Sequence, residues 1–314
     1  MASQKRVDLL WIPRINIVQG ATEKNKILYT ILFSMNLITT FTKEIYEICG
    51  HKFLESFLLT QPTHKLYVFF EDETDLYTEK TPDWLSKYNK HKNIKFFNLM
   101  NYEYKDLKIV DFVDSKLKHK INFTDEYSSP RSVKWFRPVA SIQYASELID
   151  DQFCWIDADC ILIKEFTDAF FDDILGGYNM AYLGREFFKV MRHGAYIDGK
   201  YVCVNVAEAT KKDTHTETGF IGFNVGLSGT KDLILSNFDY WVSGEVLSFE
   251  FKTDCHTLDA AIKKHDLKYN NLCEPMGEIS PIGSKVVEAS VLGEFLAHEK
   301  GMIGPILYER NSLN

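Results

Sequence analysis

The chain has 314 residues, 45% hydrophobic and 25% charged, a composition ordinary for a globular protein and long enough for one large α/β domain or two small ones. Its net charge of −8 disfavours nonspecific nucleic-acid binding by the whole surface, although it does not exclude a single basic groove. The six cysteines include no Cys-x-x-Cys pair, so neither a zinc knuckle nor a disulfide framework is indicated, and reduced thiols inside a cell are expected.

The opening residues Met-Ala-Ser-Gln-Lys-Arg lack the apolar stretch of a secretion signal. The most apolar segment, 27–41, is shorter than the ~20 residues that a membrane-spanning helix needs, and polar residues interrupt it. We therefore expect a soluble cytoplasmic protein that does not use a membrane, with this segment as a buried helix.

In chain order, the apolar run 7–12 predicts a first strand, and apolar positions at three-to-four spacing predict one or two helices over 25–49. Residues 66–70 predict a strong strand. A helix over 83–89 and a strand over 94–99 follow it. This alternation predicts an α/β fold with a mostly parallel central sheet flanked by helices.

Two apolar runs, 153–156 and 160–163, predict short buried strands separated by a turn that contains Asp157 and Asp159. A carboxylate buried without a partner costs several kcal/mol, so this pair should face a cleft, a cation or both. Carboxylate ligands suit Mn²⁺ or Mg²⁺, completed by substrate phosphates. An Asp-rich turn without any ligand is the alternative.

A helix that begins near Trp135 is predicted just before these strands. One face is apolar, and another carries Lys134 and Arg137, so a cationic face would suit diphosphate binding in the same cleft. Pro138 fits best in the first turn of this helix, because a proline further along removes a backbone hydrogen bond. Solvated surface cations are the alternative interpretation of Lys134 and Arg137.

Downstream, a helix is predicted over 165–177 and a hairpin turn at Asp198-Gly199. Another helix is predicted over 236–251. The next helix opens near Asp254, which could act as its cap, and Asp259 one turn later is expected on the surface.

Three motifs together resemble the nucleotide-sugar-dependent glycosyltransferases of the GT-A fold. The first is the strand ending in Asp-x-Asp, and the second is the Gly-Phe-Asn-x-Gly segment around Asn224. The third, at His298 and Gly301, is distantly similar to the late His-x-x-Gly-x-x-Lys of glycogenin-like retaining enzymes, although Gly304 stands where the lysine should be.

The resemblance implies a role for each motif. A divalent ion, Mn²⁺ or Mg²⁺, would be held by Asp157, Asp159 and His298. The donor would be bound by Asp157 together with the cations Lys134, Arg137 and Lys300. Side chains at the reacting centre would be Asp254, Asn224 and Glu217. The chain would form a single GT-A (Rossmann-like) domain, with residues 1–160 as the nucleotide-binding half and 161–314 as the acceptor and catalytic half.

The implied reaction moves a sugar from a nucleotide-diphosphate sugar, expected to be a UDP-sugar, to a hydroxyl of a glycan, a protein or a small molecule, with retention favoured over inversion. A transferase acting on hydroxymethylated DNA bases of a virus or phage is an alternative, which the basic stretch 105–120 keeps open. A catalytically silent sugar- or nucleotide-binding module is another. A nucleotidyltransferase is disfavoured because no Gly-rich, Lys/Arg-containing loop occurs within 7–20.

Overall fold

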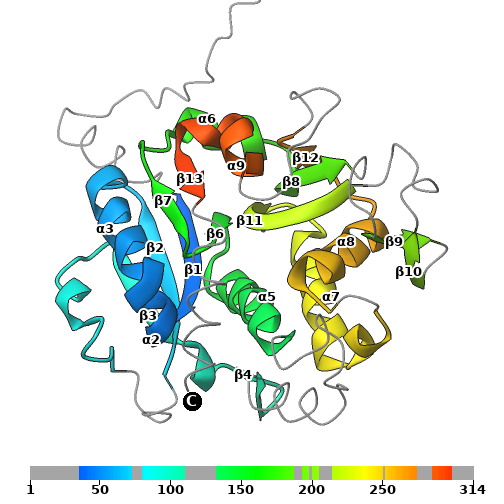
Figure 1. Ribbon diagram of the computed structural model, residues 1–314, viewed down its shortest axis with the longest axis horizontal. Helices are drawn as coiled ribbons and strands as arrows, with labels where there is room; N and C mark the ends of the chain where they lie inside the picture. The colour runs from blue at the N-terminus through cyan, green and yellow to red at the C-terminus, as the bar shows by residue number, and fades with distance from the viewer. Residues whose placement is uncertain are drawn as a thin grey trace, which may run out of the picture. The chain divides into compact units, whose positions relative to one another are not determined.

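A central sheet organises the chain (Figure 1). Among the residues that the structure describes, seven strands form it in the order β12-β8-β11-β6-β1-β2-β3. The structure is a computed structural model, and all described residues belong to one compact unit. They are residues 35–72, 80–109, 132–186, 193–197, 200–204, 214–249, 252–273 and 285–298.

Four neighbouring strands run parallel. β1 (Asn36–Thr42), β2 (Lys65–Glu71) and β3 (Ile94–Asn98) lie in chain order, and β6 (Gln152–Ile156) pairs with β1 on its other side. The order therefore reverses between β1 and β6. Open α/β sheets bind ligands at the carboxyl ends of the strands where such a reversal occurs.

The rest of the sheet has mixed direction. β11 (Thr214–Asn224) is antiparallel to both β6 and β8 (Met180–Glu186), and β12 (Tyr269–Asn271) is parallel to β8. Within the described ranges, three two-stranded ladders accompany it: β7 (Cys160–Leu162) with β13 (Leu296–His298), β9 (His193–Ile197) with β10 (Lys200–Val204), and β4 (Glu103–Tyr104) with β5 (Leu107–Lys108).

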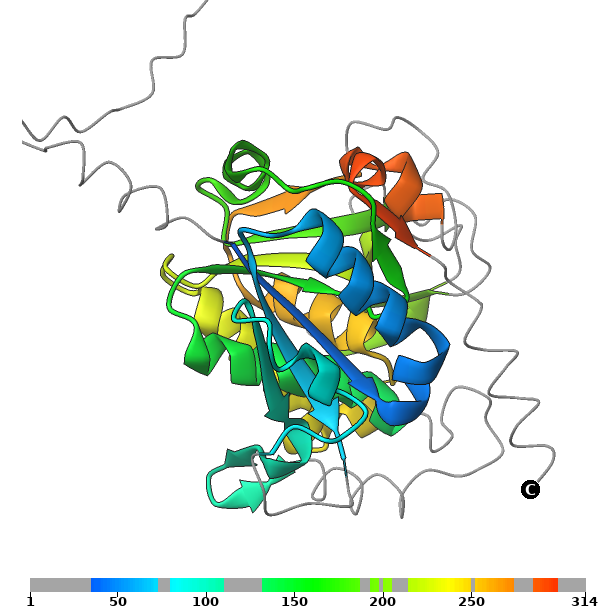
Figure 2. The same cartoon turned by 90° about the vertical axis from the view of Figure 1, so that its left-hand side faces the viewer.

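Helices cover both faces of the sheet (Figure 2). One face packs on α5 (Ser132–Leu148), α7 (Thr230–Val242) and α8 (Asp254–Lys264), and the other on α3 (His51–Thr60), α6 (Asp168–Leu175) and α9 (Lys285–Ala289). The alternation of side chains along a strand makes this arrangement work. In β2, Tyr67 and Phe69 pack in the core on the side of α5, α7 and α8. Leu66, Val68 and Phe70 pack in the core on the side of α3, α6 and α9.

Several predictions from the sequence are confirmed. The strands at 66–70, 94–99 and 153–156 are β2, β3 and β6, and the α/β class with a mostly parallel sheet flanked by helices is observed. The helix predicted over 165–177 is α6, where the Thr167 hydroxyl accepts a hydrogen bond from the Phe170 N–H and caps the helix.

The helix predicted over 25–49 is wrong over Asn36–Thr42, which is β1 in the interior of the sheet, and right over 43–49, which is helical. A strand buried on both faces shows no alternation, so an apolar run does not by itself separate strand from helix. Helical structure begins only at Lys43, with Lys43–Ile45 (α2), and passes through the π-helical turn Tyr46–Gly50 into α3. Residues 25–34 and the strand predicted at 7–12 lie outside the described residues.

Other boundaries also differ from the predictions. The helix expected over 83–89 is only a 3-10 turn at Ser86–Tyr88, and the helix expected over 236–251 is α7, followed by the 3-10 turn Glu245–Ser248. α5 begins at Ser132, so Pro138 lies in its interior rather than its first turn. The burial of Phe136, Val139 and Ala140 on α5 offsets the backbone hydrogen bond that a proline removes.

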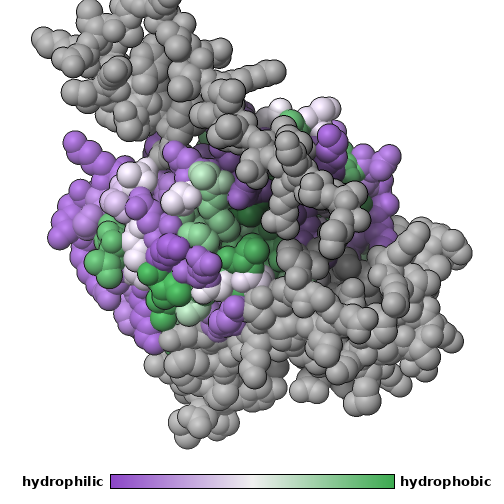
Figure 3. All heavy atoms as spheres, turned by 90° about the horizontal axis from the view of Figure 1, so that it is seen from above, coloured by the Kyte–Doolittle hydropathy of each residue, from purple (hydrophilic) through white to green (hydrophobic). Residues whose placement is uncertain are grey.

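Apolar residues are interspersed with hydrophilic ones on the face seen from above (Figure 3). Leu59, at the end of α3, and Ile163, after β7, are among the exposed large apolar side chains. Scattered exposure of this kind is ordinary for a globular surface. None of the helices within the described residues combines the length and apolarity needed to cross a bilayer.

Candidate metal and donor site

The turn between β6 and β7 places Asp157 and Asp159 at the carboxyl end of β6, beside the reversal of strand order. Its backbone is fixed from two sides. The Asp157 N–H donates to the Gly219 carbonyl at 3.1 Å, and the Cys160 N–H donates to the Asp157 carbonyl at 3.0 Å. The two carboxylates therefore stand at the end of a core strand, as the sequence predicts.

β13 brings His298 to this turn from the far end of the chain. The strand pairs antiparallel with β7, so that His298 lies directly opposite Cys160, and its N–H donates to Glu288 Oε1 at 3.2 Å. His298 Nε2 lies 3.1 Å from Asp159 Oδ1, with only 1% of the histidine side chain and 13% of the aspartate side chain exposed. Two of the three predicted metal ligands therefore meet.

β11 approaches the same pair through Gly219. Its pairing with β8 shifts register between Glu217 and Ile221, an irregularity of the kind that often lies beside active sites. A Cβ atom at position 219 would lie 3.0 Å from His298 Cε1 and 3.3 Å from Nδ1. The glycine therefore leaves room for the imidazole ring, a close approach that any side chain would obstruct.

Asp157 is held differently from Asp159. The Trp155 indole N–H donates both to Asp157 Oδ1 at 3.1 Å and to the Thr218 carbonyl at 2.9 Å. This orients the Asp157 carboxylate along the seam between β6 and β11. Its predicted role as a metal ligand stays a prediction.

One group of three metal-ligand side chains within the described residues has donor atoms all within 4.8 Å of one another, and it consists of Asp159, Cys160 and His298. Sequence reasoning missed Cys160. Its place next to Asp159 in the chain is visible in the sequence, but the strand pairing that sets it against His298 is not. The carboxylate and imidazole of this group suit a divalent cation.

The electrostatics of the group also favour a cation. Burial raises the pKa of the Cys160 thiol well above its ordinary value, and the negative charges of Asp159, Asp157, Glu217 and Glu288 raise it further. Carboxylates from the β6–β7 turn, from β11 and from α9 therefore create a negative electrostatic potential at the buried Cys160 thiol. The residues present fit a divalent ion.

Of the three predicted catalytic side chains, Glu217 acts electrostatically on this group, and Asp254 lies beside Trp155, whose indole binds Asp157. Glu217 is buried on β11, and its charge acts on the pKa values of both the Cys160 and the Cys255 thiols. Asp254 is buried at the start of α8 and lines a cavity of about 10 Å³ together with Trp155 and Thr218.

The expectation that Asp254 caps α8 needs a correction, because the N-cap residue is Thr253. Asp254 is the first helical residue, and its Oδ1 accepts a hydrogen bond from the neighbouring Cys255 N–H at 2.9 Å. A carboxylate at this position also interacts favourably with the helix dipole.

Asn224 is not brought to the metal group. It pairs with Gln152, at the opposite end of β6 from Asp157, and its Nδ2 donates to the Leu175 carbonyl at 3.5 Å. The prediction that Asp259 lies on the surface is wrong. Asp259 is buried because α8 packs on β11, and its Oδ1 accepts hydrogen bonds from the Thr216 N–H at 3.0 Å and the Thr216 hydroxyl at 2.6 Å.

Of the predicted diphosphate cations, Arg137 is the one whose side chain the structure describes. It forms an ion pair with Glu71 at the end of β2, where the arginine side chain is 20% and the glutamate side chain 6% exposed. Its charge is thus partly offset within the protein. Lys134 lies in the first turn of α5, but its side chain is outside the described part, and Lys300 lies outside the described residues altogether.

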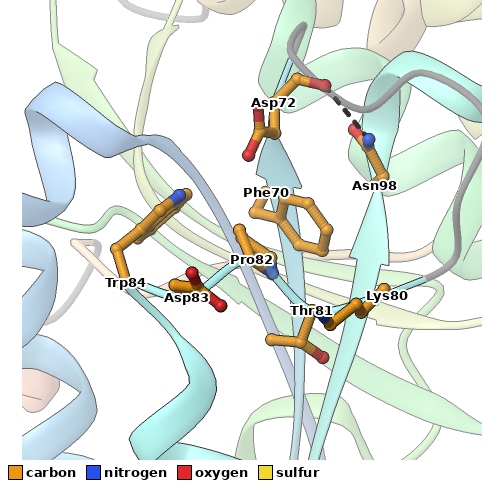
Figure 4. Close-up of a pocket in the computed structure, with 8 residues that line it drawn as sticks. All are labelled: Phe70, Asp72, Lys80, Thr81, Pro82, Asp83, Trp84 and Asn98. Carbon is orange, nitrogen blue, oxygen red and sulfur yellow. Dashed lines mark hydrogen bonds between the residues drawn. The ribbon is translucent and has the colours of Figure 1, made fainter.

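A pocket of about 310 Å³ opens at the carboxyl ends of β2 and β3 (Figure 4). Asn98 Nδ2 donates to the Asp72 carbonyl at 3.1 Å and ties the two strand ends together. The Trp84 ring packs on Tyr46 with 5.0 Å between ring centroids. The pocket therefore has an aromatic wall and a polar rim, and its lining residues are Phe70, Asp72, Lys80, Thr81, Pro82, Asp83, Trp84 and Asn98.

Neither a family model nor a curated protein sequence matches the chain. Solved glycosyltransferase structures are similar to it at low identity. An active-site mutant of LgtC has a TM-score of 0.47 at 13% identity, over 85% of this chain and 88% of that one. Mouse xyloside xylosyltransferase 1 has a TM-score of 0.46 at 15% identity, over 77% and 86%.

The WbbM bifunctional glycosyltransferase has a TM-score of 0.45 at 15% identity, and the match covers 77% of this chain but only 39% of the WbbM chain. All three of these matches have a TM-score below 0.5 and an identity of 15% or less.

Proposed function

We propose that the protein is a metal-dependent glycosyltransferase that moves a sugar, with retention, from a UDP-sugar to a hydroxyl of a glycan. One observation carries the proposal. Asp159, at the end of a core strand, and His298, near the carboxyl terminus, meet with 3.1 Å between carboxylate oxygen and imidazole nitrogen at the carboxyl edge of the sheet. This is where an α/β sheet with reversed strand order binds ligands.

Asp159 and His298 would hold Mn²⁺ or Mg²⁺, with Asp157 as a further carboxylate beside them. Such an ion, when bound, neutralises the charge that develops on a leaving diphosphate. The chain itself supplies the orientation. The Trp155 indole fixes Asp157, and the His298 ring is confined by the backbone of Gly219.

The pocket beside Trp84 is our proposed site for the base of the donor. It lies at the end of β2, two strands from β6, which corresponds to about 10 Å at the usual strand spacing. A nucleoside diphosphate can span this distance. Arg137, on α5, pairs with Glu71 at the end of β2, so it and the predicted cations Lys134 and Lys300 are the proposed partners of the diphosphate.

Glu217 and Asp254 are the proposed acidic groups at the reacting centre, because the charge of Glu217 on β11 acts on Cys160 and Asp254 on α8 lies beside Trp155, whose indole binds Asp157. A buried carboxylate there can stabilise positive charge at the anomeric carbon or accept a proton from the acceptor hydroxyl. Asn224, at the other end of β6, has no role in the proposal.

Hydrolysis of a panel of nucleotide sugars, with Mn²⁺ and with EDTA, tests the proposal. We expect turnover that needs the ion and that falls at least about 10–100-fold in Asp159→Asn and His298→Ala. Substitution of residues that only support a metal ligand already lowers activity by this factor, so loss of a ligand itself should cost at least as much. Asp172→Asn is the matched control, since Asp172 is exposed on α6.

Turnover that survives EDTA, or that both site variants retain, contradicts metal-dependent transfer. Binding of nucleotide sugars without turnover under any acceptor indicates a silent binding module instead.

A further inference from the structure

Cys160 is the member of the three-donor group that the proposed reaction does not use. Its backbone is paired directly with that of His298 in the β7–β13 ladder. Opposite residues of an antiparallel pair project their side chains to the same face, with Cβ atoms about 4.5–5.5 Å apart. The thiol and the imidazole therefore point into the same space, and Asp159 Oδ1 reaches it from the turn.

The donor types in this group differ from those that Mg²⁺ or Mn²⁺ selects. Hard oxygen ligands suit those two ions, whereas thiolate and imidazole suit zinc, and the Irving–Williams order also places Zn²⁺ above Mn²⁺. Ligand bonds of about 2.0–2.3 Å put the donor atoms of a tetrahedral zinc site about 3.3–3.8 Å apart. Since the three donor atoms here lie within 4.8 Å of one another, small side-chain rotations bring them to that spacing.

The hydrogen bond that the structure describes for the Cys160 thiol is weak. Its described hydrogen bond runs from Cys160 Sγ to the Gly219 carbonyl over 3.9 Å, and sulfur is a weak donor. Cys160 and His298 are 1% and 3% exposed, so a cation among these side chains is shielded from water while it lies close to several carboxylates. A Zn²⁺ ion that binds a thiolate releases the thiol proton to solvent.

We propose that Asp159, Cys160 and His298 bind Zn²⁺ as three protein ligands with a fourth position open, and that Zn²⁺ held there displaces the Mn²⁺ or Mg²⁺ on which donor cleavage depends. The zinc site stands on the three side chains alone. Only the inhibition of donor cleavage rests on the proposed function.

Absorption spectroscopy of the full chain with Co²⁺ in place of Zn²⁺ tests the site directly, because a cobalt–thiolate bond gives a charge-transfer band. We expect this band in the wild type, its disappearance when Zn²⁺ is added, and its absence from Cys160→Ser. Competition with a chromogenic chelator should show Zn²⁺ binding at least about tenfold weaker in Cys160→Ser. Cys154→Ser is the matched control, because Cys154 is a fully buried thiol on β6 outside the donor group.

A wild-type protein without the band, or a Cys160→Ser protein that keeps it, overturns the zinc site. The wild-type measurement decides even where the variant fails to fold. Zn²⁺ should also abolish Mn²⁺-dependent donor hydrolysis in both the wild type and Cys154→Ser, and hydrolysis that continues with Zn²⁺ bound overturns the inhibition. A wild type that hydrolyses no donor with Mn²⁺ but shows the band refutes the proposed function and the inhibition, and leaves the zinc site standing.

Discussion

Gly219 determines whether His298 can lie beside Asp159. In Gly219→Ala the new methyl group meets the imidazole at 3.0 Å, so we expect the ring to move and Mn²⁺ affinity to fall, together with a loss of about 1–3 kcal/mol in the free energy of unfolding. Gly222→Ala is the matched control on the same strand, because its methyl would meet Leu175 and Cys154 instead. Calorimetric titration with Mn²⁺ measures the difference, and equal affinities in the two variants would contradict this role for Gly219.

Arg137 and Glu71 form a largely buried ion pair. Arg137→Met removes the guanidinium from a carboxylate with little access to water, and should destabilise the protein by about 3 kcal/mol. The double variant Arg137→Met/Glu71→Leu should lose less, because neither charge is then buried. Urea unfolding of the wild type, both single variants and the double variant gives the coupling energy. Additive effects would show that the pair does not act as a unit.

At the scale of elements, the contact between α7 and the end of α8 depends on pH. Ser236 Oγ lies 2.8 Å from His265 Nε2, and burial, followed by the charge of Lys264, lowers the pKa of His265 below its ordinary value of 6.5. The unfolded chain therefore binds a proton more readily than the folded one, so this contribution to stability is complete above pH 6.5 and is lost as the pH falls through the folded-state pKa.

His265→Gln should therefore flatten the dependence of the unfolding free energy on pH in this acidic interval. Denaturant unfolding at a series of pH values measures it. An unchanged slope in the variant would assign the pH dependence to other groups.

At the scale of the whole molecule, the metal group joins the middle of the chain to a strand near its carboxyl end, β7 to β13. An ion that binds only the folded state stabilises it by mass action, by about 2.7 kcal/mol at a concentration one hundred times Kd. Mn²⁺ should therefore raise the melting temperature and slow amide exchange in Leu296–His298. Asp159→Asn should remove both effects and Asp172→Asn neither, and protection that persists in Asp159→Asn would place the ion elsewhere.

The sequence by itself determined the features that depend on local pattern. The apolar runs on either side of Asp157 and Asp159 predicted two strands with carboxylates between them, and those are β6 and β7. The apolar run 66–70 likewise predicted the strand β2, and the pattern over 165–177 predicted the helix α6. In each case the signal lies within a few consecutive residues, whose burial and hydrogen bonding are set by their neighbours in the chain.

The tertiary structure alone decided which distant residues meet. It set Cys160 against His298 through strand register, and it brought the Gly219 backbone against the same ring. It also placed Asn224 at the other end of β6 and buried Asp259 between α8 and β11. Pairing register and helix docking are fixed by packing between segments far apart in the chain, so a local pattern cannot specify them.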